Sequence, residues 1–289
     1  MKRSDRIKLN FSRNWHLPGK ERIAGWLKLS SNAQDHLKDG IIWLRDENIA
    51  LYSSADNYIE NTILRTGTYE SEIGKLIYSL LKKGDITIDI GANIGLQSLR
   101  MALSVGTEGQ VLAFEPLTYL QQKLSRNILL NGVTNISVLP VALSNTECVK
   151  AFSICSDVWN QGTFSLRQET NEENKQEVII KKGDDLPEIN ALKKIHLIKI
   201  DVEGFEFAVM QGLKNRIGEH RPKIIFEYDA HYWHLSNSNI AACYDFLLQM
   251  DYTLYQIREA NAEIIRSASS IENGNVLCIP GDKKINDKR

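Results

Sequence analysis

The chain has 289 residues, of which 43% are hydrophobic and 25% charged, and its formal net charge is -1 at pH 7. This is the composition of an ordinary globular protein, so it excludes fibrous and disordered classes and gives no global reason to expect nucleic-acid binding. No apolar run reaches the roughly 20 residues that cross a bilayer, and the basic start of the chain precedes no signal-peptide core. These features predict a cytoplasmic protein.

Residues 1–66 are predicted to form an N-terminal accessory region. Within it, residues 41–52 are expected to form two short strands around a turn. The first 29 residues are rich in Lys and Arg, with aromatic side chains interleaved. Such an arm either packs against the domain as a solvated segment or contacts an anionic membrane or a lipid-linked substrate.

Residues 67–280 alternate between apolar strands and amphipathic helices, which predicts an α/β domain with a mainly parallel sheet and helices on both faces. The expected strands are residues 86–90, 111–114, 136–143, 195–200 and 223–226, and the expected helices are residues 96–103, 120–128, 206–214 and 240–250. The last two strands, 252–257 and 276–279, have no helix between them and should be antiparallel. Residues 149–180 interrupt the alternation as a predicted β-rich insertion with an exposed loop, and residues 281–289 form a charged tail.

A glycine turn follows the first strand of this domain: Asp89 ends the strand, and the turn contains Gly91, Asn93 and Gly95. Glycines let the backbone approach a ligand closely, and the following helix N-terminus offers amide N–H groups. The spacing differs from the G-x-G-x-x-G turn of a pyrophosphate site. The Asp89 carboxylate would repel a pyrophosphate, but it suits the ammonium and sulfonium charges of S-adenosylmethionine.

The ends of the next two strands supply further cofactor candidates. The second strand ends in Glu115-Pro116, and Glu115 follows Gly95 at the distance where a dinucleotide fold presents an acid to ribose hydroxyls. The third strand ends near Ala142 and Leu143. These two residues either flank an adenine ring or simply finish the strand.

Carboxylates also follow the fourth strand, where ligands bind in open α/β sheets. Asp201 and Glu203 are predicted to face the cofactor methyl group or the acceptor, and Asp201 is a candidate for both roles. Glu206 fits equally well at the start of the next helix, where an acid favours the helix dipole.

The fifth strand leads into residues 227–234, which contain two imidazoles, two carboxylates and three aromatic rings. We expect this loop to bind the acceptor. His231 is a candidate general base because an imidazole titrates near neutral pH, although a surface histidine is an equally simple interpretation. No compact metal-ligand motif is present, so no metal site is predicted.

Four motifs, in order along the chain, resemble the FkbM family of class I methyltransferases: Thr68-Tyr69-Glu70, Asp89 to Gly95, Phe114 to Pro116, and Ile198 to Glu206. The resemblance implies a Rossmann-like, seven-stranded class I methyltransferase sheet and S-adenosyl-L-methionine as the cofactor, with Glu70 among the cofactor-binding residues. It also implies O-methylation of a hydroxyl on a sugar, glycolipid or related metabolite. Two alternatives stay open: a non-catalytic binding module of the same fold, and a nicotinamide-dependent oxidoreductase.

Overall fold

The computed structural model describes Ser4, Lys8 and residues 39–44, 46–54, 57–153, 175–258 and 261–281. Its main strands are β3 (Ile86–Ile90), β4 (Gln110–Phe114), β5 (Ile136–Leu139), β9 (Leu197–Ile200), β10 (Lys223–Tyr228), β11 (Tyr252–Ile257), β12 (Ala262–Ile264) and β13 (Gly274–Pro280). They form one eight-stranded sheet in the order β12-β11-β13-β10-β9-β3-β4-β5. Neighbours from β10 to β5 are parallel, whereas β13 is antiparallel to both β10 and β11. The predicted class I sheet, mainly parallel with an antiparallel C-terminal strand pair, is confirmed.

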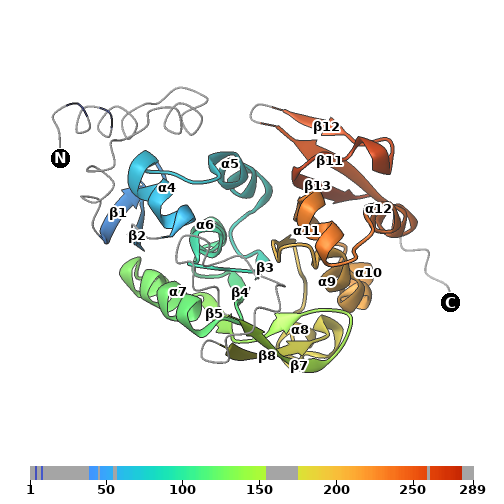
Figure 1. Ribbon diagram of the computed structural model, residues 1–289, viewed down its shortest axis with the longest axis horizontal. Helices are drawn as coiled ribbons and strands as arrows, with labels where there is room; N and C mark the ends of the chain where they lie inside the picture. Colours follow the sequence, from blue (N-terminus) through green and yellow to red (C-terminus); the bar gives the residue numbers. More distant parts are fainter. Residues whose placement is uncertain are drawn as a thin grey trace.

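Helices cover both faces of this sheet (Figure 1). They are α4 (Tyr58–Thr66), α5 (Ser71–Leu80), α6 (Leu96–Val105), α7 (Thr118–Leu130), α8 (Pro187–Asn190), α9 (Glu206–Gly212), α10 (Lys214–His220), α11 (Ala230–Leu235) and α12 (Ile240–Gln249). Because strand side chains alternate between faces, Ile88 and Ile224 pack on one side with Leu247 of α12, while Val111 packs on the other with Ile77 of α5. The helix expected over residues 206–214 is present as α9, which ends at Gly212, and a second short helix, α10, follows from Lys214.

The predicted strand 136–143 is broken at Pro140. Proline has no N–H to donate to a strand ladder, and β5 ends at Leu139. After Pro140 and Val141 the chain forms β6 (Ala142–Leu143), which is outside the central sheet and pairs with β8 (Lys175–Lys181). With β7 (Cys148–Ser153), these strands form a separate three-stranded sheet. Residues 154–174, which include most of the predicted exposed loop, lie outside the described residues.

The N-terminal hairpin predicted over residues 41–52 is present as β1 (Gly40–Leu44) and β2 (Ile49–Ser53), which are antiparallel. Its buried side chains share a hydrophobic cluster with α6 and α7: Leu44 and Leu51 pack there with Leu99 and Leu120. Apart from Ser4 and Lys8, the basic arm lies outside the described residues, so its proposed membrane contact stays a prediction. In the described part of the chain, no helix combines the length and the apolar character needed to cross a membrane.

Candidate active site

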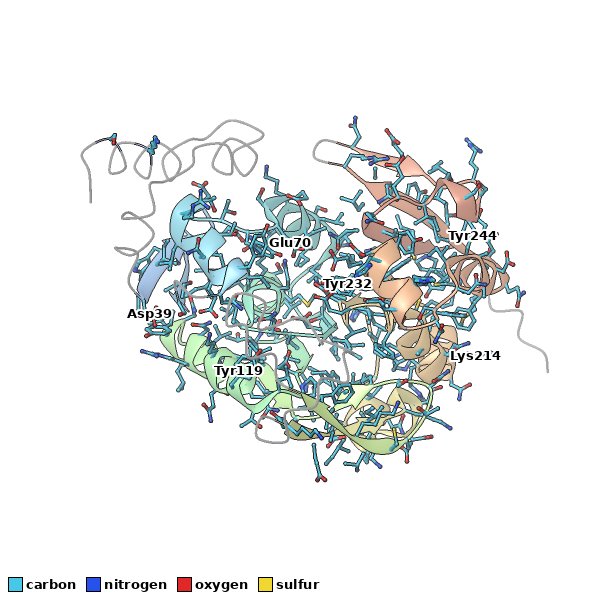
Figure 2. The ribbon with its side chains drawn as sticks, in the orientation of Figure 1. Asp39, Glu70, Tyr119, Lys214, Tyr232 and Tyr244 are labelled. Atoms are coloured by element: carbon cyan, nitrogen blue, oxygen red, sulfur yellow. The ribbon has the colours of Figure 1, made fainter. Side chains whose placement is uncertain are left out.

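A cavity lies at the carboxyl ends of β3, β4, β9 and β10. Its lining residues are Ile59, Tyr69, Glu70, Gly91, Ala92, Asn93, Ile94, Leu96, Gln97, Glu115, Leu120, Lys199, Asp201, Val202, Glu203 and Glu227. Figure 2 shows Glu70 between the N-terminal elements and the C-terminal half of the molecule. Four of the five strand ends that the sequence singled out therefore meet in one place, as the topology of an open α/β sheet requires; the exception is the end of the third strand, at Ala142 and Leu143.

The glycine turn after β3 is packed tightly against its neighbours. Gly91 has φ +83, and a Cβ atom there would lie 1.9 Å from the carbonyl oxygen of Asp201, so only glycine fits. Asn93 also has a positive φ, 51. Gly95 caps α6 and touches Leu124 of α7, but it is not among the described residues that line the cavity. Its contribution is to the shape of the turn.

Glu115 stands at the end of β4 and is held by the backbone of two loops. Its Oε2 accepts a hydrogen bond from the Asn93 N–H and its Oε1 accepts one from the Leu117 N–H, both at 2.9 Å. Burial raises the pKa of Glu115 to about 7.

Pro116 differs from Glu115 in its contacts. The Pro116 carbonyl oxygen accepts a hydrogen bond from Gln176 of β8 at 2.8 Å, and the residue does not line the cavity as described.

Asp89 lies beneath the glycine turn and is completely buried. Its Oδ2 accepts a hydrogen bond from the Ser98 hydroxyl at 2.5 Å, whereas Oδ1 has no hydrogen-bond partner within the described ranges. Burial raises the pKa of Asp89. Because Asp89 does not line the cavity in this structure, direct contact with a cofactor charge stays a prediction, and the contact that the structure shows is to α6.

A lysine and two carboxyl groups line the cavity at the ends of β9 and β10. The buried Lys199 donates from Nζ to Asp201 Oδ2 at 2.7 Å, and Asp201 is in turn hydrogen-bonded to Glu227. Burial works against ionisation of Asp201, but the Lys199 charge outweighs it and lowers the pKa of Asp201. The Asp201 charge and burial raise the pKa of Glu227 to about 10. At neutral pH the two carboxyl groups therefore share one proton.

The two other acids after β9 differ in what they contact. Glu203 lines the cavity with a left-handed backbone, φ 53, and burial raises its pKa to about 8. Non-glycine residues seldom adopt this conformation outside functional sites and tight turns. Glu206 begins α9, where its Oε1 accepts hydrogen bonds from the Val202 and Gly204 N–H groups at 3.0 and 3.1 Å. The helix-start interpretation of Glu206 is confirmed.

Besides Asp89, Gly95 and Pro116, three more predicted site residues are not among the described lining residues of the cavity. His231 is exposed on α11, and its ring packs against Tyr232. Asp229 caps the start of this helix. Residues 227–234 are thus a strand end and a helix, and of them only Glu227 is among the lining residues that the structure describes. Ala142 and Leu143 form β6 of the small sheet, and the Leu143 side chain is buried in the main hydrophobic core. The structure gives these three residues no contact with the cavity.

Sequence reasoning missed Lys199 and Arg100, both buried charges. The alternation of strand side chains was a usable signal for Lys199, since it stands two residues before Asp201 and therefore points to the same face. Arg100 lies inside an amphipathic helix, where its sequence position carries no such signal. Over the described ranges, no group of three or more His, Cys, Asp or Glu side chains is arranged to hold a metal ion.

Comparison with known proteins identifies the family. Residues 89–254, more than half of the chain, match the sequence profile described as the methyltransferase FkbM domain. The chain belongs to the FkbM methyltransferase family. The resemblance inferred from the four motifs is thereby confirmed, and membership supports S-adenosylmethionine as the cofactor of this FkbM-family protein.

Individual relatives are more distant. Methyltransferase 1 of Beauveria bassiana is 27% identical over 143 residues, which cover 44% of this chain and 57% of that protein. The hexuronic acid methyltransferase AglP of Haloferax volcanii is 28% identical over 152 residues, covering 51% and 58%. The chain thus spans less than two thirds of these relatives. A solved FkbM methyltransferase from Methylobacillus flagellatus is similar with a TM-score of 0.45 and 14% identity, covering 76% of this chain and 52% of that one.

Proposed function

We propose that this FkbM-family protein transfers the methyl group of S-adenosylmethionine to a hydroxyl oxygen of a sugar, glycolipid or related metabolite. The observation that carries the proposal is the convergence of four strand ends on one cavity, in which the glycine turn after β3 lies between Glu115 at the end of β4 and a lysine-centred acid cluster at the ends of β9 and β10. Such strand-end crevices are where open α/β sheets bind nucleotides.

The two ends of the cavity suit the two ends of this cofactor. Glu115 lies beside the glycine turn, so its carboxylate is placed for the ribose hydroxyls, which are hydrogen-bond donors. Glu70 and Asp201 carry acidic side chains at the other end. They suit the ammonium and sulfonium charges, since opposite charges attract strongly in a partly dehydrated site.

The transfer requires alignment and a proton acceptor. The cofactor supplies a methyl group on a positively charged sulfur, and the acceptor oxygen must approach this carbon in line with the bond that breaks. The hydroxyl proton must leave as the new C–O bond forms. Besides Glu70, the carboxyl groups of the cavity at this end are Asp201, Glu203 and Glu227, and one of these three is our candidate for the proton acceptor.

A sugar acceptor is supported by one relative, AglP, which is described as a hexuronic acid methyltransferase. The cavity adds that the carboxyl groups of Asp201, Glu203 and Glu227 and the ring of Tyr69 are available to an acceptor. Carboxyl groups suit sugar hydroxyls because an ionised carboxylate accepts hydrogen bonds and a protonated carboxyl group both donates and accepts them.

The test is methyl transfer from S-adenosylmethionine labelled in its methyl group, with the full chain and fractions of neutral sugars, acidic sugars and glycolipids. We expect label in a sugar or glycolipid product, with the methyl carbon assigned to oxygen by NMR, and equal amounts of S-adenosylhomocysteine. Asp201→Asn should bind the cofactor but transfer slowly. Transfer to nitrogen or carbon would overturn the O-methyl assignment, and cofactor binding without turnover in any fraction would favour the non-catalytic module.

A further inference from the structure

A buried arginine connects the N-terminal hairpin to the cavity. Arg100 of α6 has a fully buried side chain and forms a two-point ion pair with Glu47 in the β1–β2 turn: Nε to Oε2 and Nη2 to Oε1, both 2.6 Å. Glu47 is nearly buried as well. Two-point pairs of this kind fix the orientation of both groups. The hairpin therefore sets the position of the Arg100 guanidinium.

The same guanidinium fixes the cavity loop that contains Glu70. Arg100 Nη1 donates to the Glu70 carbonyl oxygen at 3.1 Å and to Gln97 Oε1 at 3.2 Å, and Nη2 donates to the Tyr69 carbonyl oxygen at 3.0 Å. Gln97 Nε2 then donates to Glu70 Oε2 at 2.8 Å. Both the backbone and the carboxylate of Glu70 are thus held through Arg100 and Gln97.

This support is needed because Glu70 has a left-handed backbone, φ 46 and ψ 53, immediately before α5. Such a conformation is unfavourable for a residue with a side chain. The guanidinium also requires space that only glycine leaves: a Cβ atom on Gly74 would lie 2.7 Å from Arg100 Nε. Both the backbone conformation of Glu70 and the glycine at position 74 therefore fit the contact with Arg100.

A second bridge joins the hairpin to the glycine turn. The fully buried Asn127 of α7 accepts a hydrogen bond from the Tyr52 N–H at 2.8 Å and donates one to the Ile94 carbonyl oxygen at 2.8 Å. Asn131, one turn later, exchanges two hydrogen bonds with Ala50, at 2.9 and 2.7 Å. Asn127 therefore connects β2 to the glycine turn, just as Arg100 connects the β1–β2 turn to Glu70.

We propose that the hairpin of residues 40–53 is a working part of the cofactor site, in which Glu47 is a positioning residue that acts through Arg100 to hold Glu70 against the ammonium group of S-adenosylmethionine. This inference rests on the proposed function. Glu47 and Glu70 both lie outside the segment 89–254 that matches the family profile, so the match itself assigns them no role.

The charges of the cavity place Glu70 at the amino-acid end of the cofactor. Its charged neighbours are Lys199, Asp201 and Arg100, whereas Glu115 stands beside the glycine turn that receives the ribose. The Glu47 carboxylate neutralises the Arg100 guanidinium from the side of the hairpin. Without that charge, the guanidinium pairs with the Glu70 carboxylate instead, because a buried cation is very costly without a partner. Glu70 is then less able to bind an ammonium group.

The test compares two ligands on full-length variants by calorimetry. S-adenosylhomocysteine has the amino-acid end, and 5′-methylthioadenosine has the same adenosine and sulfur without it. In Glu47→Gln, which keeps the side-chain shape, we expect the Kd of S-adenosylhomocysteine to rise at least tenfold and that of 5′-methylthioadenosine to change less than twofold. Glu47→Asp, which keeps the charge, should lie between Glu47→Gln and the unmodified chain.

The matched control is Glu60→Gln. Glu60 is a fully buried carboxylate in the same region, but its partners are Lys123 and the Ser54 N–H rather than the Glu70 loop. We expect both ligands to bind this variant normally even if its melting temperature falls. Equal weakening of the two ligands in Glu47→Gln, or no weakening, would overturn the positioning role. Failure of the unmodified chain to bind S-adenosylhomocysteine would instead overturn the proposed function.

Discussion

The two ends of the cavity are built in different ways. At the Glu115 end, one carboxylate is held by backbone N–H groups of Asn93 and Leu117, which lie within 25 residues of each other along the chain. At the other end, Lys199, Asp201 and Glu227 are side chains from two strands that balance one another's charge. The first end therefore presents a single carboxyl group that the backbone holds and whose pKa is about 7, whereas the second is a cluster of side chains whose charges depend on one another.

The largest expected effect is on the stability of the cluster. Lys199→Met removes the cation among the buried acids and should lower the free energy of unfolding by about 3–5 kcal/mol, since carboxylates left without a partner are costly. Urea unfolding measures this. The matched control is Lys223→Met, a lysine on β10 whose Nζ donates to the Leu80 carbonyl oxygen and which should lose about 1 kcal/mol. Equal losses would contradict the charge balance inferred for the cluster.

The next largest effect belongs to the backbone-held end. Glu115→Ala leaves the Asn93 and Leu117 N–H groups without an acceptor and removes the ribose contact. We therefore expect the Kd values of S-adenosylhomocysteine and 5′-methylthioadenosine to rise together by about 10–100-fold, or about 1.4–2.8 kcal/mol. Calorimetry checks this, with the more exposed Glu147→Ala as the control. Weakening of only one ligand would show that Glu115 does not face the shared ribose.

A pH series tests the shared proton of the acid cluster, and Glu115, whose pKa burial raises to about 7, adds a change of the same sign. The pKa of Glu227 rises from 4.5 to about 10 on folding, because of Asp201, burial, their hydrogen bond and the nearby Glu70, against the opposing Lys199. The folded state thus keeps a proton that the unfolded state releases, so this stability is full below about pH 4.5 and is lost as pH rises toward 10. Glu203 adds a decline of the same sign toward about 8. Urea unfolding at several pH values should show a shallower decline for Glu227→Gln, and parallel curves would contradict the shared proton.

The smallest expected effect is at His231. A general base contributes about 10²–10⁴-fold to a rate, but His231 is exposed and outside the described lining of the cavity. With an acceptor found by the transfer assay, His231→Ala should change kcat by less than about threefold. A loss of 100-fold would restore the sequence-based hypothesis and would require α11 to move toward the cavity.

Much of the fold was predictable because apolar strands and a helical period dominate the chain between β3 and α12. The Glu115 end was predictable for the same reason, since a glycine turn and an acid at successive strand ends form a local pattern. The other end was only partly predictable: Asp201 and Glu203 follow a strand, but whether Glu227 or His231 turns toward them depends on where α11 begins. That is decided by Asp229, which caps the helix.

Two errors have specific causes. Ala142 and Leu143 were expected either to flank the adenine ring or to finish the third strand, but the break at Pro140 places them in the small sheet. Arg100 was missed because its partners, Glu47 and the Tyr69–Glu70 backbone, lie 30 to 53 residues away along the chain. Contacts at that separation come from tertiary packing, which a single sequence does not display.

The central claim is most directly tested by a crystal structure of the full chain with S-adenosylhomocysteine. We predict ligand density in the cavity at the ends of β3, β4, β9 and β10, with the ribose hydroxyls on Glu115 and the ammonium group within hydrogen-bond distance of Glu70. Density for the amino-acid end beside Glu115, or a ligand bound elsewhere with this cavity unfilled, would contradict it.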